Sequence, residues 1–465
     1  MASIMTKVRE RTSRSRASWS LEEVVRGLKT VLRGCGNYFR HRNSNRTSNS
    51  IDHYILLRLA RLAGTKYGLR GINWASRFTD ADFVADEILS RTCETAGSDD
   101  FGPAGWKEGF EILLGDLNDR VQLTGLGRLA IRELITASLT TRLSLVNWAK
   151  EHPEVLERRV ESPIIIVGTA RAGTTLLSYL LDQDDRFRSL LAWEVSDPVP
   201  PPHAEELRSG PRVEAGRRGQ ELLQAFHPSL RTIHHEDPNG PTECIGLLAQ
   251  HFMSIVWLFG AAPTYSKWLI NDAKYQSAYE YHHLALQVLQ AHTSSHWSLK
   301  AIQHAIALDA LTLTYPDARL LILHRDPVAV LASACSLVQS TLTRFTTAEY
   351  RDSIASTCLD YFEAGVIRSA KFIDTHPTWP IVEVRYDDLV GDPLATVRRI
   401  YEEFDEPLRP SVEKKMRAWL LDHPQGKFGR HRYSLSAFGL DRGEIEDRFS
   451  TYRERYDLGH EAVPD

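Results

Sequence analysis

The sequence predicts an α/β protein in which a three-layer sandwich with a central parallel sheet is preceded by an all-helical N-terminal region. Three observations predict this fold class. Apolar residues recur at helical spacing between about residues 51 and 161. After residue 162, short and fully apolar runs alternate with helical patterns, as in sheets that helices cover on both faces. A glycine-rich turn joins the first apolar run to its helix.

The composition is that of a soluble globular protein, and it argues against several classes of function. The chain has 465 residues, of which 42% are hydrophobic and 25% are charged. Its 56 Lys and Arg residues nearly balance 60 Asp and Glu residues, so it lacks the basic field that nonspecific nucleic-acid binding needs. The five cysteines show no C-x-x-C pair, which argues against a zinc site, a redox pair or a disulfide framework. We expect no metal, no nucleic-acid partner and a reducing, cytoplasmic location.

The composition of residues 1–50 predicts that they form a basic, flexible N-terminal arm. The arm has no apolar core followed by a small-residue cleavage site, so it does not predict a secretory signal. Contact with a membrane surface or an import receptor is the alternative. Residues 51–161 predict a helical region, interrupted by a turn-rich segment at 97–103. Its apolar positions at helical spacing include Ile55, Leu59, Leu62, Phe83, Ile88, Phe110, Leu113, Leu117, Ile131, Leu134, Ile135 and Leu139.

One apolar stretch, residues 245–262, nearly reaches the length of a membrane span. It contains Gln250, His251 and Ser254 in its middle, which favours a buried helix over a transmembrane one. Glu243 stands at the expected start of this helix, and Pro263 is expected to end it. We therefore predict no membrane span here.

Fully apolar runs predict strands of the parallel sheet at 164–167, 320–323 and 380–384. The second run leads to Asp326, a candidate helix N-cap, and to Pro327, which a first helical turn tolerates. A helix from about Pro393 follows the third run. Together these units predict strands that alternate with helices.

The turn at 168–175 reads G-T-A-R-A-G-T-T and has the glycine spacing of a P-loop-like phosphate-binding turn. Such a turn aims backbone N–H groups and the positive end of a helix at an anion. A tight turn with no ligand is the alternative. The lysine that nucleoside triphosphatases place after the second glycine is missing, because Thr174 stands there and the cation is Arg171 within the loop. ATP hydrolysis or kinase activity is therefore disfavoured.

At these residues the chain resembles the sulfotransferases that use 3′-phosphoadenosine 5′-phosphosulfate (PAPS), particularly their bacterial-type branch. The resemblance implies that residues 162–465 are a sulfotransferase catalytic domain. In that family the loop holds the 5′-phosphosulfate, which implies this role for Arg171, Ala172, Gly173, Thr174 and Thr175. The family's second signature, an Arg at a strand end with a Ser eight residues later, matches Arg325 and Ser333, and implies that both bind the 3′-phosphate.

Other segments carry the same resemblance. The W-E pair at 193–194 precedes a proline-rich run, and W-x-L-K-x-x-x-H occupies 297–304 ahead of Y-P-D-A at 315–318. Near the C-terminus, residues 426–440 resemble the segment that folds over the nucleotide in the family. The resemblance implies nucleotide contacts there for Lys427, Arg430 and Tyr433.

Sulfuryl transfer needs a base for the acceptor hydroxyl and donors for the charge on the moving group. We expect Glu194 to be the base, because Glu-type members of the family carry the carboxylate in this region. Its alternative role is to pair with a cation or to cap the proline-rich loop. Histidine is the base in other branches, so His304, His234 and His235 remain candidates. Lys300 is expected to stabilise the sulfuryl or leaving group, and its alternative role is that of an ordinary lysine whose stem packs on apolar surface while its charge reaches water. Glu243 either caps its helix or orients substrate.

The sequence therefore predicts an enzyme that transfers a sulfuryl group from PAPS to a hydroxyl group by in-line displacement. The acceptor is expected to be a small molecule, a lipid or a glycan, and homo-oligomers are possible. Two alternatives stay open. One is a P-loop kinase or nucleoside-phosphate transferase, and the other is a nucleotide-binding protein of the same fold without turnover.

Overall fold

The structure is a computed structural model that describes residues 10, 82–226, 237, 239–343, 345–424 and 434–461. The predicted arm at 1–50 lies outside the described residues except for Glu10. The boundaries of the three predicted units stay predictions.

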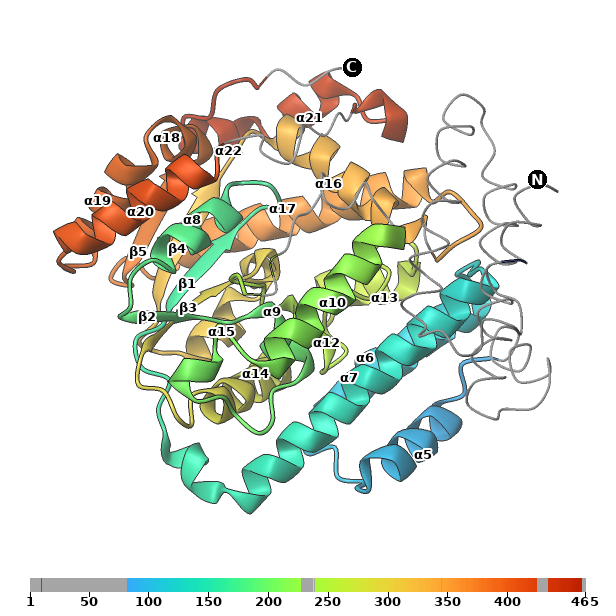
Figure 1. The fold of residues 1–465 in the computed structure, drawn as a ribbon. Coiled ribbons are helices and arrows are strands. Elements are labelled where there is room, and N and C mark those ends of the chain that lie inside the picture. The colour runs from blue at the N-terminus through green and yellow to red at the C-terminus, as the bar shows by residue number, and fades with distance from the viewer. Residues whose placement is uncertain are drawn as a thin grey trace.

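Five strands form one parallel sheet in the order β2-β3-β1-β4-β5 (Figure 1). They are β1 (Ile164–Gly168), β2 (Phe187–Ser189), β3 (His296–Lys300), β4 (Arg319–His324) and β5 (Ile381–Arg385). The three apolar runs of the sequence are β1, β4 and β5, so the predicted parallel sheet is confirmed. The pattern missed β2, which has three residues, and β3, in which polar His296, Ser298 and Lys300 alternate with apolar residues.

Both faces of the sheet are buried, because successive side chains of a strand point to opposite faces. In β1, Ile165 and Val167 belong to one hydrophobic cluster, whereas Ile164 and Ile166 belong to another. The first cluster includes residues of α14 (Gln276–Leu289), α15 (Leu308–Thr314), α16 (Pro327–Leu342) and α17 (Arg351–Thr375). The second includes residues of α8 (Thr174–Leu181), α18 (Tyr386–Gly391), α19 (Pro393–Glu403) and α20 (Pro410–Asp422). The predicted three layers are therefore confirmed.

Local signals place the helices that follow β4 and β5. Asp326 caps α16, since its Oδ1 accepts the backbone N–H of Val328 at 3.3 Å, and Pro327 occupies the first turn. Pro393 likewise opens α19. Both starts agree with the sequence, because a proline in the first turn loses no intrahelical hydrogen bond.

The helical N-terminal region packs on the first cluster rather than forming a core of its own. Its described helices are α5 (Ala85–Ala96), α6 (Lys107–Asp119) and α7 (Gly125–Glu151), and the turn predicted at 97–103 follows α5. Ile88, Phe110 and Ile135 from these helices join the cluster that covers the sheet. The long helix α7 runs along one side of the molecule, and α5 packs against it (Figure 1).

The apolar stretch at 245–262 is buried as predicted, but the prediction that it forms a single helix is wrong. Only α12 (Ile245–Ala249) is helical, and turns follow until Pro263 begins α13 (Pro263–Asn271) instead of ending a helix. Hydrogen bonds outside the helical pattern form here, because the backbone N–H of Ser254 donates to the Tyr265 hydroxyl at 3.0 Å. Phe252, with φ of 55°, is in the left-handed region. Within the described ranges, none of the helices combines the length and hydrophobicity that crossing a membrane requires.

The remaining helices are α9 (Ala192–Ser196), α10 (Pro211–Phe226), α21 (Arg442–Arg448) and α22 (Ser450–Arg455), with a 3-10 turn, η5 (Ile302–Ile306), after β3.

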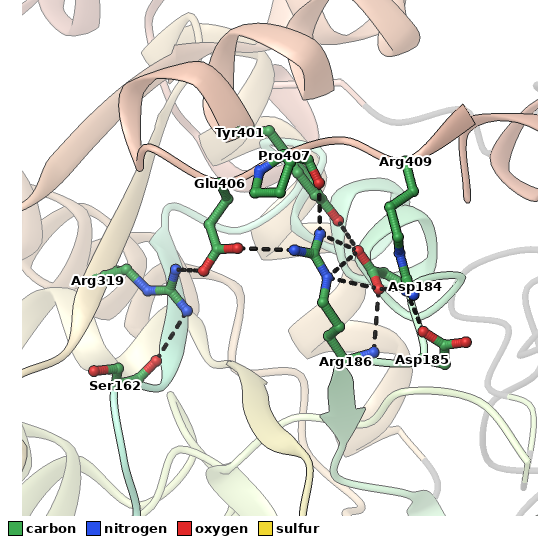
Figure 2. A network of polar contacts seen from close by, with 9 residues as sticks. All are labelled: Ser162, Asp184, Asp185, Arg186, Arg319, Tyr401, Glu406, Pro407 and Arg409. Atoms are coloured by element: carbon green, nitrogen blue, oxygen red, sulfur yellow. Dashed lines mark hydrogen bonds and ion pairs between the residues drawn. The ribbon is translucent and has the colours of Figure 1, made fainter. Parts of the chain in front are cut away.

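A polar network fastens the connection between α19 and α20 to the amino ends of the strands (Figure 2). Glu406 accepts from Arg186 at 2.9 Å and from Arg319, at the start of β4, at 2.8 Å. Arg186 and Arg409 both donate to the enclosed carboxylate of Asp184, at 2.7 Å each. The network lies at the end of the sheet opposite to the glycine-rich turn. It therefore serves to hold the scaffold together while the carboxyl end carries the candidate site.

Candidate active site

Three chain segments leave the sheet at its carboxyl edge. Gly168 ends β1, Lys300 ends β3, and Arg325 directly follows β4. Because β3, β1 and β4 are neighbours in the sheet, their ends lie side by side. The carboxyl edge of an open parallel sheet is where ligands of α/β proteins bind.

The loop after β1 has the backbone of a close-fitting turn. Arg171 has a φ of 65° and Gly173 a φ of 90°, both in the left-handed region. A Cβ atom at position 173 would lie 2.8 Å from Cδ2 of Leu389, so a side chain there would displace Leu389 as well as strain the backbone. Helix α8 begins at Thr174, where the first N–H groups of a helix have no partner within it. The hydroxyl oxygen of Thr169 is buried without a hydrogen-bond partner among the described residues.

Lys300 lies beside this loop, as its predicted role requires. Its ammonium group donates to the hydroxyl of Thr175 at 3.2 Å, although the side chain is almost wholly buried. The Glu243 carboxylate lies 3.8 Å away through Oε1. The backbone N–H of Cys244 donates to the carbonyl of Lys300 at 2.9 Å, which ties the Glu243 segment to the end of β3. The loop, a cation and a carboxylate thus meet at one place.

The sequence predicted that Glu243 caps its helix or orients substrate, and it did not predict a free carboxylate oxygen there. Oε2 is buried and has no hydrogen-bond partner among the described residues, while the side chain keeps 15% of its surface exposed. The Tyr361 hydroxyl and Nε2 of His304 are among the other buried polar atoms in the described ranges that share this condition. The carboxylate of Glu243 and the phenol of Tyr279 both raise the pKa of Tyr361, which burial raises most. Tyr279 in turn bonds to His304 at 2.8 Å.

His304 is fully enclosed, and its candidacy as the base stays a prediction. Its Nδ1 atom and the Tyr279 hydroxyl are hydrogen-bonded, and burial lowers the pKa of the imidazole to about 3. The ring is therefore neutral at neutral pH. His234 and His235 lie outside the described residues.

Glu194 is held by other residues of the fold. Oε1 accepts a charge-assisted hydrogen bond from Arg188, and Oε2 accepts the backbone N–H of Leu191 at 3.0 Å, which caps α9. The side chain is fully buried. Burial raises the pKa of Glu194, while Arg188 opposes that rise. The pair with a cation is one of the alternatives that the sequence left open, but the cap is on α9 and not on the proline-rich loop.

Arg325 lies against the loop from the side of β4. Nη1 donates to the carbonyl oxygen of Arg171, and the guanidinium lies 3.8 Å from the centre of the Tyr386 ring. Nε and Nη2 form a fork that grips the two carboxylate oxygens of Glu461 at 2.7 and 2.6 Å. Ser333 is buried on α16, the helix that follows Arg325. Lys427, Arg430 and Tyr433 lie outside the described residues, so their roles stay predictions.

Comparison with known families gives two matches. A model described as "Sulfotransferase family" matches residues 163–410. A model described as "Group II intron, maturase-specific domain" matches residues 1–78, of which the structure describes only Glu10.

Individual proteins agree with the first match. The "Omega-hydroxy-beta-dihydromenaquinone-9 sulfotransferase Stf3" of Mycobacterium tuberculosis (strain CDC 1551 / Oshkosh) is 27% identical over 342 residues, which are 67% of this chain and 83% of that protein. The crystal structure of sulfotransferase STF9 from Mycobacterium avium superposes with a TM-score of 0.76 at 33% identity, covering 82% of this chain and all of that one. The structure of sulfotransferase STF1 from Mycobacterium tuberculosis H37Rv gives 0.71 at 29% identity, covering 79% and 99%.

Proposed function

The chain belongs to the sulfotransferase family, and from that premise we propose that it moves a sulfuryl group from PAPS to a hydroxyl group on a hydrophobic, lipid-like acceptor. The observation that carries the proposal is the meeting of the loop, Lys300 and Glu243 at the carboxyl edge of the sheet. A sulfotransferase needs a phosphate cradle, a cation and a base, and these three features supply them.

The residues of the loop fit a nucleotide 5′-phosphosulfate. Backbone N–H groups at the start of α8 are hydrogen-bond donors for its oxygens, and the buried Thr169 hydroxyl is a further donor. Lys300 contributes from β3 the positive charge that a triphosphatase loop carries on its own lysine. Arg325, anchored by the carbonyl of Arg171, offers a planar fork suited to the 3′-phosphate.

Glu243 is the base that the geometry supports best. Its Oε2 atom faces no competing donor among the described residues, whereas both oxygens of Glu194 are engaged. In the transfer, the acceptor oxygen forms a bond to sulfur as the bond from sulfur to the 5′-phosphate oxygen breaks. Glu243 takes the proton of the attacking hydroxyl, and Lys300, within 3.8 Å, stabilises the negative charge in the site.

Aromatic side chains beside Glu243 support a hydrophobic acceptor. The rings of Tyr361 and Phe259 contact each other edge to face with centroids 5.2 Å apart, and Tyr279 lies within electrostatic reach of the Tyr361 hydroxyl. The mycobacterial relative Stf3 is named for a hydroxylated menaquinone. We therefore place a hydroxylated prenyl quinone or a similar lipid alcohol ahead of a glycan as acceptor.

The test is transfer to a panel of acceptors. Full-length protein is incubated with PAPS and with hydroxylated prenyl quinones, long-chain alcohols, phenols and glycans, and products are sought by mass spectrometry as a gain of one sulfuryl group. We expect the lipid alcohols to react best. We also expect adenosine 3′,5′-bisphosphate to raise the melting temperature more than ATP with Mg²⁺ does. Equal stabilisation by ATP, or transfer confined to glycans, would contradict the proposal.

A further inference from the structure

The C-terminal end of the described chain reaches into the proposed donor site. Helix α22 ends at Arg455, and the following residues lead to Glu461, whose carboxylate takes both forked nitrogens of Arg325. A carboxylate and a phosphate engage an arginine fork in the same bidentate way. We propose that Glu461 competes with the donor's 3′-phosphate for Arg325, so that nucleotide binding displaces the C-terminal segment.

Two observations show that the Glu461 segment is held at the site by more than one contact. Its backbone N–H donates to Oδ2 of Asp326 at 2.9 Å, next in sequence to Arg325. One residue earlier, His460 bonds through Nδ1 to Glu446 at 3.1 Å. The carboxylate is thus delivered to Arg325 in a defined position.

Arg325 itself does not depend on Glu461 for its position. The carbonyl of Arg171 accepts from Nη1, and the ring of Tyr386 supports the guanidinium from one face. Loss of the Glu461 carboxylate therefore leaves the fork aimed as before. The side chain of Arg325 is 11% exposed, so water screens the competition between the two anions only weakly.

The two anions exclude each other for an electrostatic reason. A phosphate dianion placed on the fork would lie against the carboxylate of Glu461, and like charges at contact distance repel strongly where water is scarce. Since the proposal rests on the proposed function, in which Arg325 binds the 3′-phosphate, it predicts a selective effect. Nucleotides with a 3′-phosphate must displace Glu461 from Arg325. Nucleotides without a 3′-phosphate have no group that binds the Arg325 fork, so Glu461 does not affect their binding. Competition of this kind reduces the apparent affinity for the nucleotide. The affinity is multiplied by the fraction of molecules in which Glu461 is not bound to Arg325.

The experiment compares the full-length wild type with Glu461→Gln and with Glu454→Gln, an exposed glutamate on α22, as the matched control. Calorimetry measures the affinity of each protein for adenosine 3′,5′-bisphosphate and for adenosine 5′-monophosphate. We expect E461Q to bind the bisphosphate about tenfold more tightly, about 1.4 kcal/mol, with no change for the monophosphate. The control should match wild type for both nucleotides.

Hydrogen exchange supplies a second measurement on the wild type. The backbone amide of Glu461, which Asp326 holds, should exchange faster once the bisphosphate is bound. Equal or weaker bisphosphate binding by E461Q, or slower exchange at Glu461 on binding, would overturn the inference. A wild type that binds no bisphosphate at all would instead overturn the proposed function on which the inference rests.

Discussion

Two glutamates, the buried Glu194 and the partly exposed Glu243, have different surroundings. Glu194 is fully enclosed, and its two oxygens accept from Arg188 and from the backbone of Leu191. Glu243 keeps one oxygen without a partner among the described residues and lies 3.8 Å from Lys300. A general base needs an available lone pair, so of these two glutamates Glu243 is the better candidate for the proposed base.

Glutamine substitutions at these two positions should therefore have opposite effects. Glu243→Gln should lower kcat by between about 100-fold and 10,000-fold while the affinity for adenosine 3′,5′-bisphosphate stays the same. Glu194→Gln should instead destabilise the fold by about 3–5 kcal/mol, because Arg188 loses its buried partner. Steady-state kinetics, calorimetry and thermal unfolding measure the three quantities. If E194Q were stable but inactive and E243Q active, the base would be Glu194.

Tyr361 tests the position of the acceptor. Its hydroxyl is buried without a partner among the described residues, and a hydroxyl of the acceptor would supply one. Tyr361→Phe should raise the acceptor KM about tenfold, the loss expected for one hydrogen bond, without changing nucleotide affinity. Tyr350→Phe, at the residue that precedes the helix α17 containing Tyr361, is the matched control, since that hydroxyl already accepts the Gln122 N–H at 2.7 Å. An unchanged acceptor KM in Y361F would place the acceptor elsewhere.

At the scale of elements, the loop between β1 and α8 depends on Gly173 for two reasons, its backbone conformation and the close packing of Leu389. Its φ of 90° disfavours any side chain, and a Cβ there would also meet Leu389 at 2.8 Å. The loop thus packs closely against α18, which contains Leu389. A shift of this contact would move the backbone N–H groups that are proposed to hold the phosphate.

Alanine substitutions can separate these two reasons. Gly210 has a φ of 108° but nothing within 4 Å of a Cβ, so Gly210→Ala should cost about 1–2 kcal/mol of stability through backbone strain and leave nucleotide affinity unchanged. Gly173→Ala should cost more and should weaken bisphosphate binding about tenfold or more. Chemical denaturation and calorimetry provide the measurements. Equal effects of the two substitutions would mean that the contact with Leu389 does not set the loop.

At the scale of the whole molecule, buried histidines couple stability to pH. His251, His282 and His304 are enclosed, and burial lowers the pKa of each, to about 3 for His304. Arg142 adds to the effect on His251, and His304 adds to that on His282. In the unfolded chain a histidine titrates near pH 6.5. Between that pH and the folded pKa, the unfolded state binds more protons, so stability is lost as pH falls.

Thermal unfolding between pH 7.5 and 5.5 should show this loss. Each of the three histidines should contribute about 1.4 kcal/mol of destabilisation at pH 5.5. His304→Gln should reduce the pH dependence by about one such contribution. The control His460→Gln, at an exposed position, should leave it unchanged. A melting temperature that is flat over this range would contradict the assignment.

The sequence by itself determined the parallel sheet, its three most apolar strands and the glycine-rich loop after the first of them. These features depend on neighbours along the chain: a continuous apolar run marks 320–323 as a strand with two buried faces, and glycine spacing marks 168–175. Even the missing lysine of the loop was evident. The same local pattern could not find β3, because its buried Ser298 and Lys300 interrupt the apolar run.

Only the tertiary structure decided which side chains share the site. Lys300 reaches Thr175, and Glu461 reaches Arg325, across 125 and 136 residues of chain. These residues meet because of the order of the strands in the sheet and the path of the C-terminal segment. Neither can be deduced from the periodicity of apolar residues along the chain. The same holds for the proposed choice of glutamate, because Glu194 pairs with Arg188 whereas Glu243 lies 3.8 Å from Lys300. A side chain's role follows from its partners, and partners are fixed only when the chain has folded.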